Sequence, residues 1–334
     1  MSSPNTVINR FDLSLSTAEF SLAMNRKGYI GHLVFPPIPV GKQSSSFARI
    51  PIEALLTPVE DTERKPKSGY SRDDFEWETD NYNTKDHGVE ETIDDRQVKM
   101  YASEIRAEQI ARDRGVNRVL QAYEVACAAA AFDTAVFTGA YTSTPTTPWS
   151  TAASADPLAD VDRWRELFIT NCGMKPNALV LEHKALIAMI RTARIEDLIK
   201  YSGQDDPKAL RRALPQLADL LQLERIIVAD SPVKNTGGRG AAATISRVWD
   251  ATKAQLARIY DGADLEAPEA QLGRTIQWSE EAGALPGSDD MGIGVIIEEY
   301  PENAVRGSVI RVRTDYQIKR LHTQAGMLIT SLIA

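Results

Sequence analysis

Residues 70–95, YSRDDFEWETDNYNTKDHGVEETIDD, are the stretch of sequence that decides the fold. Ten aspartates and glutamates and a single lysine lie between positions 73 and 95, whereas the whole chain of 334 residues carries a net charge of −8. Phe75 and Trp77 alternate with acidic residues, which is the period of a β-strand, and residues 80–83 form a turn signal. The pattern predicts an acidic, two-stranded excursion from the body of the protein.

Residues 94–134 follow directly and predict one long helix. At 1.5 Å per residue it would be about 60 Å long. Asp94 or Asp95 suits its positive N-terminal end, and Gly115 is the weak point, unfavourable by up to about 1 kcal/mol relative to alanine. We expect an apolar stripe on this helix to pack on the C-terminal strands. The stripe comprises Ile105, Val116, Leu120, Tyr123 and Cys127.

The opposite face of this helix carries arginines. Arg96, Arg114 and Arg118 share that face, and Arg106 lies on its flank. A solvated helix face is the simplest interpretation, and a contact with an acidic surface is the alternative. Arg112 falls on the apolar side, where we expect it to extend out of the stripe or to pair with an acid.

Composition restricts the function classes. The isoelectric point of about 5.2 argues against broad binding to a phosphate backbone, which needs a basic face. The two cysteines, Cys127 and Cys172, form no CxxC or Cys/His cluster, so neither a zinc site nor a disulfide framework is expected. We expect no signal peptide and no membrane-spanning segment.

The rest of the chain predicts an α+β protein of about two domains. Residues 1–40 are expected to form an irregular arm, because prolines at 36, 37 and 39 oppose both helix and central strand. The Thr/Ser/Pro-rich residues 139–158 mark a domain boundary. Helices and strands then alternate, and three segments near the C-terminus are strongly β: 292–300, 308–321 and 326–334.

No catalytic motif emerges, and we expect no cofactor. The four histidines are separated in sequence, and no nucleophile elbow is present. Acidic pairs need burial or a metal ion before they do acid–base chemistry. One enzymatic alternative remains, a metal-dependent hydrolase that would use Asp289, Asp290 and Glu298.

Three further phrases accompany the acidic stretch: FPPIPVGKQSSSFARIP (35–51), KPNALVLEHKAL (175–186) and IRVRTDYQIKRLHTQAGMLI (310–329). Together with the order of the parts, they resemble the major capsid proteins of tailed bacteriophages, which have the Hong Kong 97-type shell fold. The resemblance covers nearly the whole chain. It implies an N-terminal arm (1–45), an extended β-hairpin loop (46–92), a spine helix within a peripheral domain (93–150), an axial domain (151–291) and returning peripheral strands (292–334).

The resemblance also implies a function without catalysis. The chain would self-assemble through pentamers and hexamers into an icosahedral head that encloses double-stranded DNA, which it would contact only weakly. A separate scaffolding protein, a portal and possible decoration proteins would be its partners, with no membrane involved. It would assemble in the host bacterial cytoplasm and end in the virion. A bacterial encapsulin-like nanocompartment shell is the alternative with the same fold.

Subunit contacts would then take the place of an active site. We expect the acidic stretch to lie across a neighbouring copy, where its charge would meet arginines of the spine helix. The alternative for Trp77 is that it packs on its own hairpin. The candidate contact residues are Asp73, Asp74, Phe75, Glu76, Trp77, Glu78, Lys85, Arg106, Arg114 and Arg118.

Overall fold

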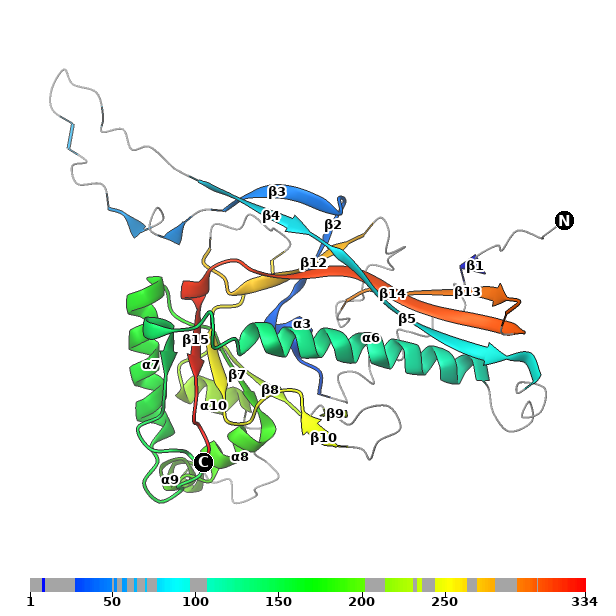
Figure 1. Cartoon of the computed structure of the whole chain (residues 1–334). Coiled ribbons are helices and arrows are strands. Elements are labelled where there is room, and N and C mark those ends of the chain that lie inside the picture. The colour runs from blue at the N-terminus through cyan, green and yellow to red at the C-terminus, as the bar shows by residue number, and fades with distance from the viewer. Residues whose placement is uncertain are drawn as a thin grey trace.

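A six-stranded sheet, a five-stranded sheet and one long helix form the body of the chain (Figure 1). Side chains of the long helix and of both sheets share one hydrophobic cluster, so the parts form a continuous core. The computed structural model describes residues 8–9, 28–49, 51–52, 56–58, 63–64, 70, 77–96, 107–201, 214–230, 233–235, 244–262, 269–279, 293–304 and 306–334.

The six-stranded sheet is built around its longest strand, β14. β14 pairs with β13 over Gly307–Arg313, with β5 over Gly307–Tyr316 and with β12 over Tyr316–Arg320, always antiparallel, while β2 joins β12 in parallel. The strand order is β1-β13-β14-β12-β2, with β5 also on β14. The strands are β1 (Ile8–Asn9), β2 (Pro37–Val40), β5 (Lys85–Asp94), β12 (Gly273–Trp278), β13 (Ile296–Glu302) and β14 (Gly307–Arg320).

The five-stranded sheet has the order β6-β15-β11-β7-β8 and is surrounded by shorter helices (Figure 1). Its second hydrophobic cluster joins β7, β11 and β15 to α7 and α8 through wholly buried side chains such as Trp164, Leu181 and Met189. The elements are β6 (Thr142–Ser143), β7 (Ala178–Glu182), β8 (Arg225–Ala229), β11 (Ala254–Ala257), β15 (Gly326–Ile329), α7 (Pro157–Cys172), α8 (His183–Ile190), α9 (Ala193–Tyr201) and α10 (Leu214–Leu220), with 3-10 turns η1 (Gly139–Tyr141) and η3 (Thr323–Ala325).

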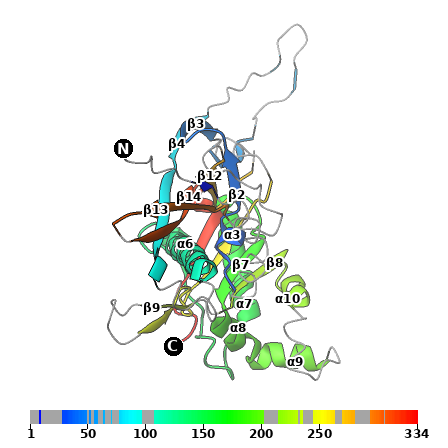
Figure 2. The same cartoon turned by 90° about the vertical axis from the view of Figure 1, so that its right-hand side faces the viewer.

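The predicted long helix is α6 (Ala107–Ala131), which we call the spine helix; Asp95 and Arg96 are also helical, and residues 97–106 lie outside the described part. In Figure 2 the spine helix is seen nearly end-on, with β13 and β14 above it. The predicted stripe is confirmed at the described positions, all buried in one cluster with Ile310, Val312 and Leu328. These positions are Val116, Leu120, Tyr123 and Cys127; Ile105 lies outside the described residues.

Gly115 lies where the spine helix crosses β14. A Cβ atom added at this glycine would lie 2.7 Å from a methyl group of Val312, closer than real Cβ atoms approach a neighbour. The helix therefore gives up some intrinsic helix propensity at Gly115 in exchange for close packing on the sheet.

Two short antiparallel ribbons complete the fold. β3 (Ser44–Arg49) pairs with β4 (Glu78–Asn83), and β9 (Val233–Asn235) pairs with β10 (Ile245–Arg247). In Figures 1 and 2 the first ribbon lies along the upper edge of the body, and the second lies on the other side of the spine helix.

The prediction of an irregular arm over residues 1–40 is wrong for its last ten residues. Residues 31–34 form a short helix, α3 (Gly31–Val34), and Pro37–Val40 are strand β2. Val34 and Phe35 are fully buried. The prolines are accommodated because β2 is an edge strand, where a missing N–H is tolerated.

The expected domain boundaries also do not coincide with the division of the strands between the two sheets. β12 was expected in the axial domain, but it is paired with β14 in the six-stranded sheet. β15 was expected among the returning peripheral strands, but it lies between β6 and β11 in the five-stranded sheet. The chain therefore passes between the two sheets more often than a division into successive blocks allows.

The acidic stretch 70–95 is not a hairpin closed on itself. β4 pairs with β3, whereas β5 pairs with β14 of the main sheet. Residues 85–92, which were expected in the extended loop, thus belong to the body of the protein.

Candidate subunit-contact surface

The β3–β4 hairpin is fixed to the body by polar contacts with the second half of β14 and the residue after it. The guanidinium of Arg49 donates a hydrogen bond to the Leu321 carbonyl at 2.7 Å, and the Lys319 ammonium donates to Asp80 at 2.7 Å. Partial burial raises the pKa of Asp80, but the hydrogen bonds from Lys319 and the Asn81 amide and the nearby positive charges outweigh it, so this pKa is lowered overall. These contacts fix the direction of strands β3 and β4 relative to the main sheet.

Aromatic side chains on the segment between these two strands are turned to solvent. Trp77, directly before β4, has a relative exposure of 68%, and Tyr70 has one of 72%. The Arg64 guanidinium lies 5.2 Å from the centre of the Tyr70 ring, in cation–π geometry. Tryptophan and tyrosine are enriched at protein–protein interfaces, so these two exposed rings are candidate contact residues.

The acidic residues of β5 already have partners within the same chain. Glu91 lies 2.6 Å from Arg118 and 3.8 Å from Arg114 on the spine helix, and Glu90 lies 2.8 Å from Arg311. The hydrogen bond from Arg311 lowers the pKa of Glu90 despite the opposing effect of desolvation. At least part of the charge complementarity that we expected between neighbouring copies is therefore internal.

The remaining predicted contact residues divide into two groups. Glu78 is paired with Arg49 at the end of β3 and β4 that leads into the connecting segment, and Lys85 is exposed at the start of β5, opposite Tyr316 in the register. The other candidates lie outside the described residues: Asp73, Asp74, Phe75, Glu76 and Arg106. Arg112, expected to extend out of the stripe or to find an acid, is paired with Asp113 at 2.6 Å.

Sequence reasoning missed one buried residue on the spine helix, Glu124. Its carboxylate accepts hydrogen bonds from the backbone amides of Ile30 and Gly31 at 2.9 and 2.8 Å and from the indole of Trp249 at 2.6 Å. The spacing was a signal, because Glu124 is four residues after Leu120 and thus on the buried stripe. It joins the N-terminal segment, the spine helix and the loop after β10.

The described residues give no support to the enzymatic alternative. Glu298 is held by Arg313 at 2.8 Å and by Arg311 at 3.4 Å, while Asp289 and Asp290 lie outside the described part. Within that part, no group of three His, Cys, Asp or Glu side chains could hold a metal ion. No helix there is both long and apolar enough to cross a bilayer. Both cysteines are free and buried, and burial raises the pKa of each thiol.

Comparison with known proteins places this architecture among shell proteins. No protein-family model matches the sequence, and no curated protein matches it either. Among solved structures, a phage-related protein from Bordetella bronchiseptica RB50 superposes with a TM-score of 0.67 at 23% identity, over 98% of both chains. The capsid of cyanophage P-SCSP1u gives a TM-score of 0.53 at 10% identity, over 89% of this chain and 86% of that one.

A third match, the virus-like particle of Pyrococcus furiosus, has a TM-score of 0.51 at 10% identity and covers 96% of this chain and 98% of that one. The chain has the Hong Kong 97-type shell fold. The predicted fold class, α+β with the Hong Kong 97-type shell fold, is thereby confirmed. At these identities the likeness concerns the fold.

Proposed function

We propose that this chain is the major capsid protein of a tailed bacteriophage, a structural subunit without catalytic activity. The observation that carries the proposal is a shell fold whose β3–β4 hairpin holds Trp77 in solvent. An exposed indole gains free energy when it is buried against another surface, and tryptophan is enriched at protein–protein interfaces. A neighbouring copy in a closed shell supplies such a surface.

The contact would use the residues around Trp77 rather than the whole acidic stretch. Because Glu90 and Glu91 are paired with Arg311 and Arg118, we assign the contact to the predicted candidate acids before β4. Exposed ion pairs contribute only about 0–1 kcal/mol each, so their role is to set the register between copies. Burial of the indole is the larger gain, since an aromatic anchor dominates many interfaces. The acids in question are Asp73, Asp74 and Glu76.

The partners follow from a shell assembled from many copies. Heterologous contacts between identical subunits close into rings, here pentamers and hexamers. A separate scaffolding protein would guide assembly in the bacterial cytoplasm, and a portal and decoration proteins would complete the virion. The acidic chain would contact its packaged double-stranded DNA weakly, because a wall of this charge does not retain phosphates.

Electron microscopy of the purified protein tests the function. Closed particles or rings of subunits are the expected result, with or without a scaffolding protein. A monomer of 36.8 kDa at every protein concentration, salt concentration and scaffold condition would contradict it. Particles that contain a protein cargo and no DNA would identify the encapsulin-like alternative.

A substitution at Trp77 tests the contact separately. Trp77→Ala should leave the subunit folded and abolish or strongly weaken assembly, because Trp77 is exposed in the single chain. Trp77→Phe is the matched control and should keep most of the assembly. Normal particles from Trp77→Ala would refute this contact while leaving the function intact. Deleting residues 73–90 is a poorer test, since it removes β4 and most of β5.

A further inference from the structure

The described part of the chain contains five buried carboxylates: Glu124, Asp160, Glu182, Glu298 and Asp315. Three of them lie against an arginine: Asp160 and Arg163 are 3.3 Å apart, Glu298 and Arg313 are 2.8 Å apart, and Glu182 is paired with Arg247. Glu124 is 1% exposed, and in the described part of the chain its hydrogen bonds come from uncharged donors, with no ion pair. A buried carboxylate without a cation is expensive to ionise.

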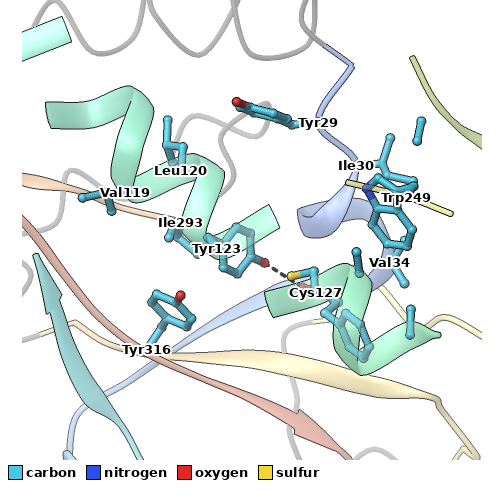
Figure 3. Packing of buried hydrophobic residues seen from close by; sticks show 14 of the residues in the cluster. Tyr29, Ile30, Val34, Val119, Leu120, Tyr123, Cys127, Trp249, Ile293 and Tyr316 are labelled. Carbon is cyan, nitrogen blue, oxygen red and sulfur yellow. Dashed lines mark hydrogen bonds between the residues drawn. The ribbon is translucent and has the colours of Figure 1, made fainter. Parts of the chain in front are cut away.

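The three donors come from two parts of the chain that are far apart in sequence. One carboxylate oxygen accepts from Ile30 and Trp249, and the other accepts from Gly31. Figure 3 shows Ile30 and Trp249 close together beside Cys127 of the spine helix. A Cβ atom at Gly31 would lie 2.7 Å from the second oxygen, so the close approach requires glycine. Glu124 thus holds the N-terminal segment and the loop after β10 in one arrangement.

We propose that Glu124 is a proton-sensitive latch, which holds residues 29–31 and Trp249 against the spine helix and is weakened when it ionises. The latch belongs to the single subunit and does not depend on the function proposed above.

None of the titratable groups described around Glu124 places a positive charge beside its carboxylate. Burial raises the pKa of Tyr29 from the N-terminal segment and of Tyr123 and Cys127 from the spine helix, and the negative charge of Glu124 adds to this in each case. His32 lies on the adjacent short helix, but burial lowers its pKa and favours the neutral ring. Trp249, the contact from the third segment, does not titrate.

The direction of the pH effect follows from linkage. Burial raises the pKa of Glu124 above its ordinary value of 4.5, and the hydrogen bonds from Ile30, Trp249 and Gly31 offset this only in part. In an opened latch, contact with water would return the pKa of the Glu124 carboxyl group to its ordinary value. The closed latch therefore binds the proton more tightly than the open one. Acid favours closure, and this advantage is lost as the pH rises through the raised pKa.

The consequence is a contact that is weaker at neutral than at mildly acidic pH. When the latch opens, the hold on the segment before β2 and on the loop after β10 is released together, because one carboxylate serves both. Two segments about 220 residues apart in sequence are thereby coupled through the spine helix.

Hydrogen–deuterium exchange on the unassembled subunit tests the latch. Protection of the Ile30 and Gly31 amides, corrected for the intrinsic pH dependence of exchange, should fall several-fold between about pH 4.5 and about pH 8. In Glu124→Gln, which cannot ionise, protection at these amides should not vary with pH. Asp160→Asn is the matched control, because Asp160 is a buried carboxylate that meets Arg163, and it should leave the profile at residues 30 and 31 unchanged.

A second variant keeps the test decisive if Glu124→Gln does not fold. Trp249→Phe removes a hydrogen bond that lowers the pKa of Glu124, so the midpoint of the wild-type profile should move to higher pH. An unchanged midpoint in Trp249→Phe, the same pH profile in Glu124→Gln as in the wild type, or protection that rises with pH would overturn the proposal.

Discussion

Replacing Gly115 by alanine should destabilise the subunit, although alanine is the better helix former. The gain in helix propensity is about 1 kcal/mol. Against it, the new Cβ would lie 2.7 Å from a methyl group of Val312, which is fully buried. Val312 is β-branched and has few rotamers to choose from, so the helix or the strand must shift. Overpacking of this kind costs about 1–3 kcal/mol, which leaves a net loss of about 0–2 kcal/mol.

The decisive experiment is a double-mutant cycle with Val312→Ala, which removes the methyl groups that the new Cβ at position 115 would meet. Val312→Ala alone should cost about 2 kcal/mol, from two buried carbon atoms at about 0.8 kcal/mol each plus a cavity. In that background, Gly115→Ala should stabilise the subunit by up to about 1 kcal/mol. The sign of the Gly115→Ala effect thus reverses, with a coupling energy of about 1–3 kcal/mol.

Urea unfolding of the unassembled subunit measures these differences as changes in midpoint at constant slope. Gly115→Leu serves as a harsher control and should be worse than Gly115→Ala in both backgrounds. If Gly115→Ala stabilises the otherwise unchanged subunit by about 1 kcal/mol, the spine helix does not approach β14 as closely as the structure has it, and the reasoning fails.

Two further predictions concern the faces and the end of the spine helix. Leu120→Asp should prevent folding because it buries an unpaired charge, whereas Arg114→Ala should change stability by only about 0–1 kcal/mol; circular dichroism and thermal unfolding distinguish them, and the opposite ranking would reverse the two faces. The hydrogen bond from Arg320 lowers the pKa of Asp133 below its ordinary value of 3.8. The ionised Asp133 therefore stabilises the folded subunit at pH values above 3.8, and this stabilisation is lost as the pH falls through the lowered pKa. The difference in melting temperature between wild type and Asp133→Asn should therefore shrink from about pH 6 to about pH 2, and a constant difference would contradict this linkage.

The spine helix could be predicted because its information is local. Apolar residues at a spacing of 3.6 and an almost unbroken run of helix formers indicate both the element and its buried face. Gly115 was also visible, but only as a weak point. Its role became clear with the strand that crosses the helix, and strand partners far away in sequence are not encoded in a local pattern.

The edge strand β2 shows a different limit. Prolines at 36, 37 and 39 correctly excluded a central strand, and the mistake was to extend that exclusion to every strand. An edge position next to β12 uses one side of the backbone, so proline fits there. The location of an edge depends on the order of strands in the sheet, which the sequence of this segment does not contain.

Glu124 was missed because the sequence analysis looked for stretches with many charged residues. The acidic stretch 70–95 attracted attention through its ten carboxylates, whereas Glu124 is a single acid among alanines and apolar residues. Its position on the helical stripe, between Leu120 and Cys127, contains the relevant information. A lone acid on an apolar face must find hydrogen-bond donors when it is buried, and here the donors come from residues 30, 31 and 249.

The same contrast explains the division of the acidic stretch. Sequence presents one charged block, but strand pairing separates it, because β5 belongs to β14 and β4 belongs to β3. Glu91 faces the spine helix and meets Arg118, whereas Trp77 precedes β4 and faces solvent. Glu90 and Glu91 of β5 consequently make ion pairs within the subunit that carries them. An interface defined by net charge would include acids that are already paired, so the exposed indole of Trp77 is the sharper guide to the proposed contact.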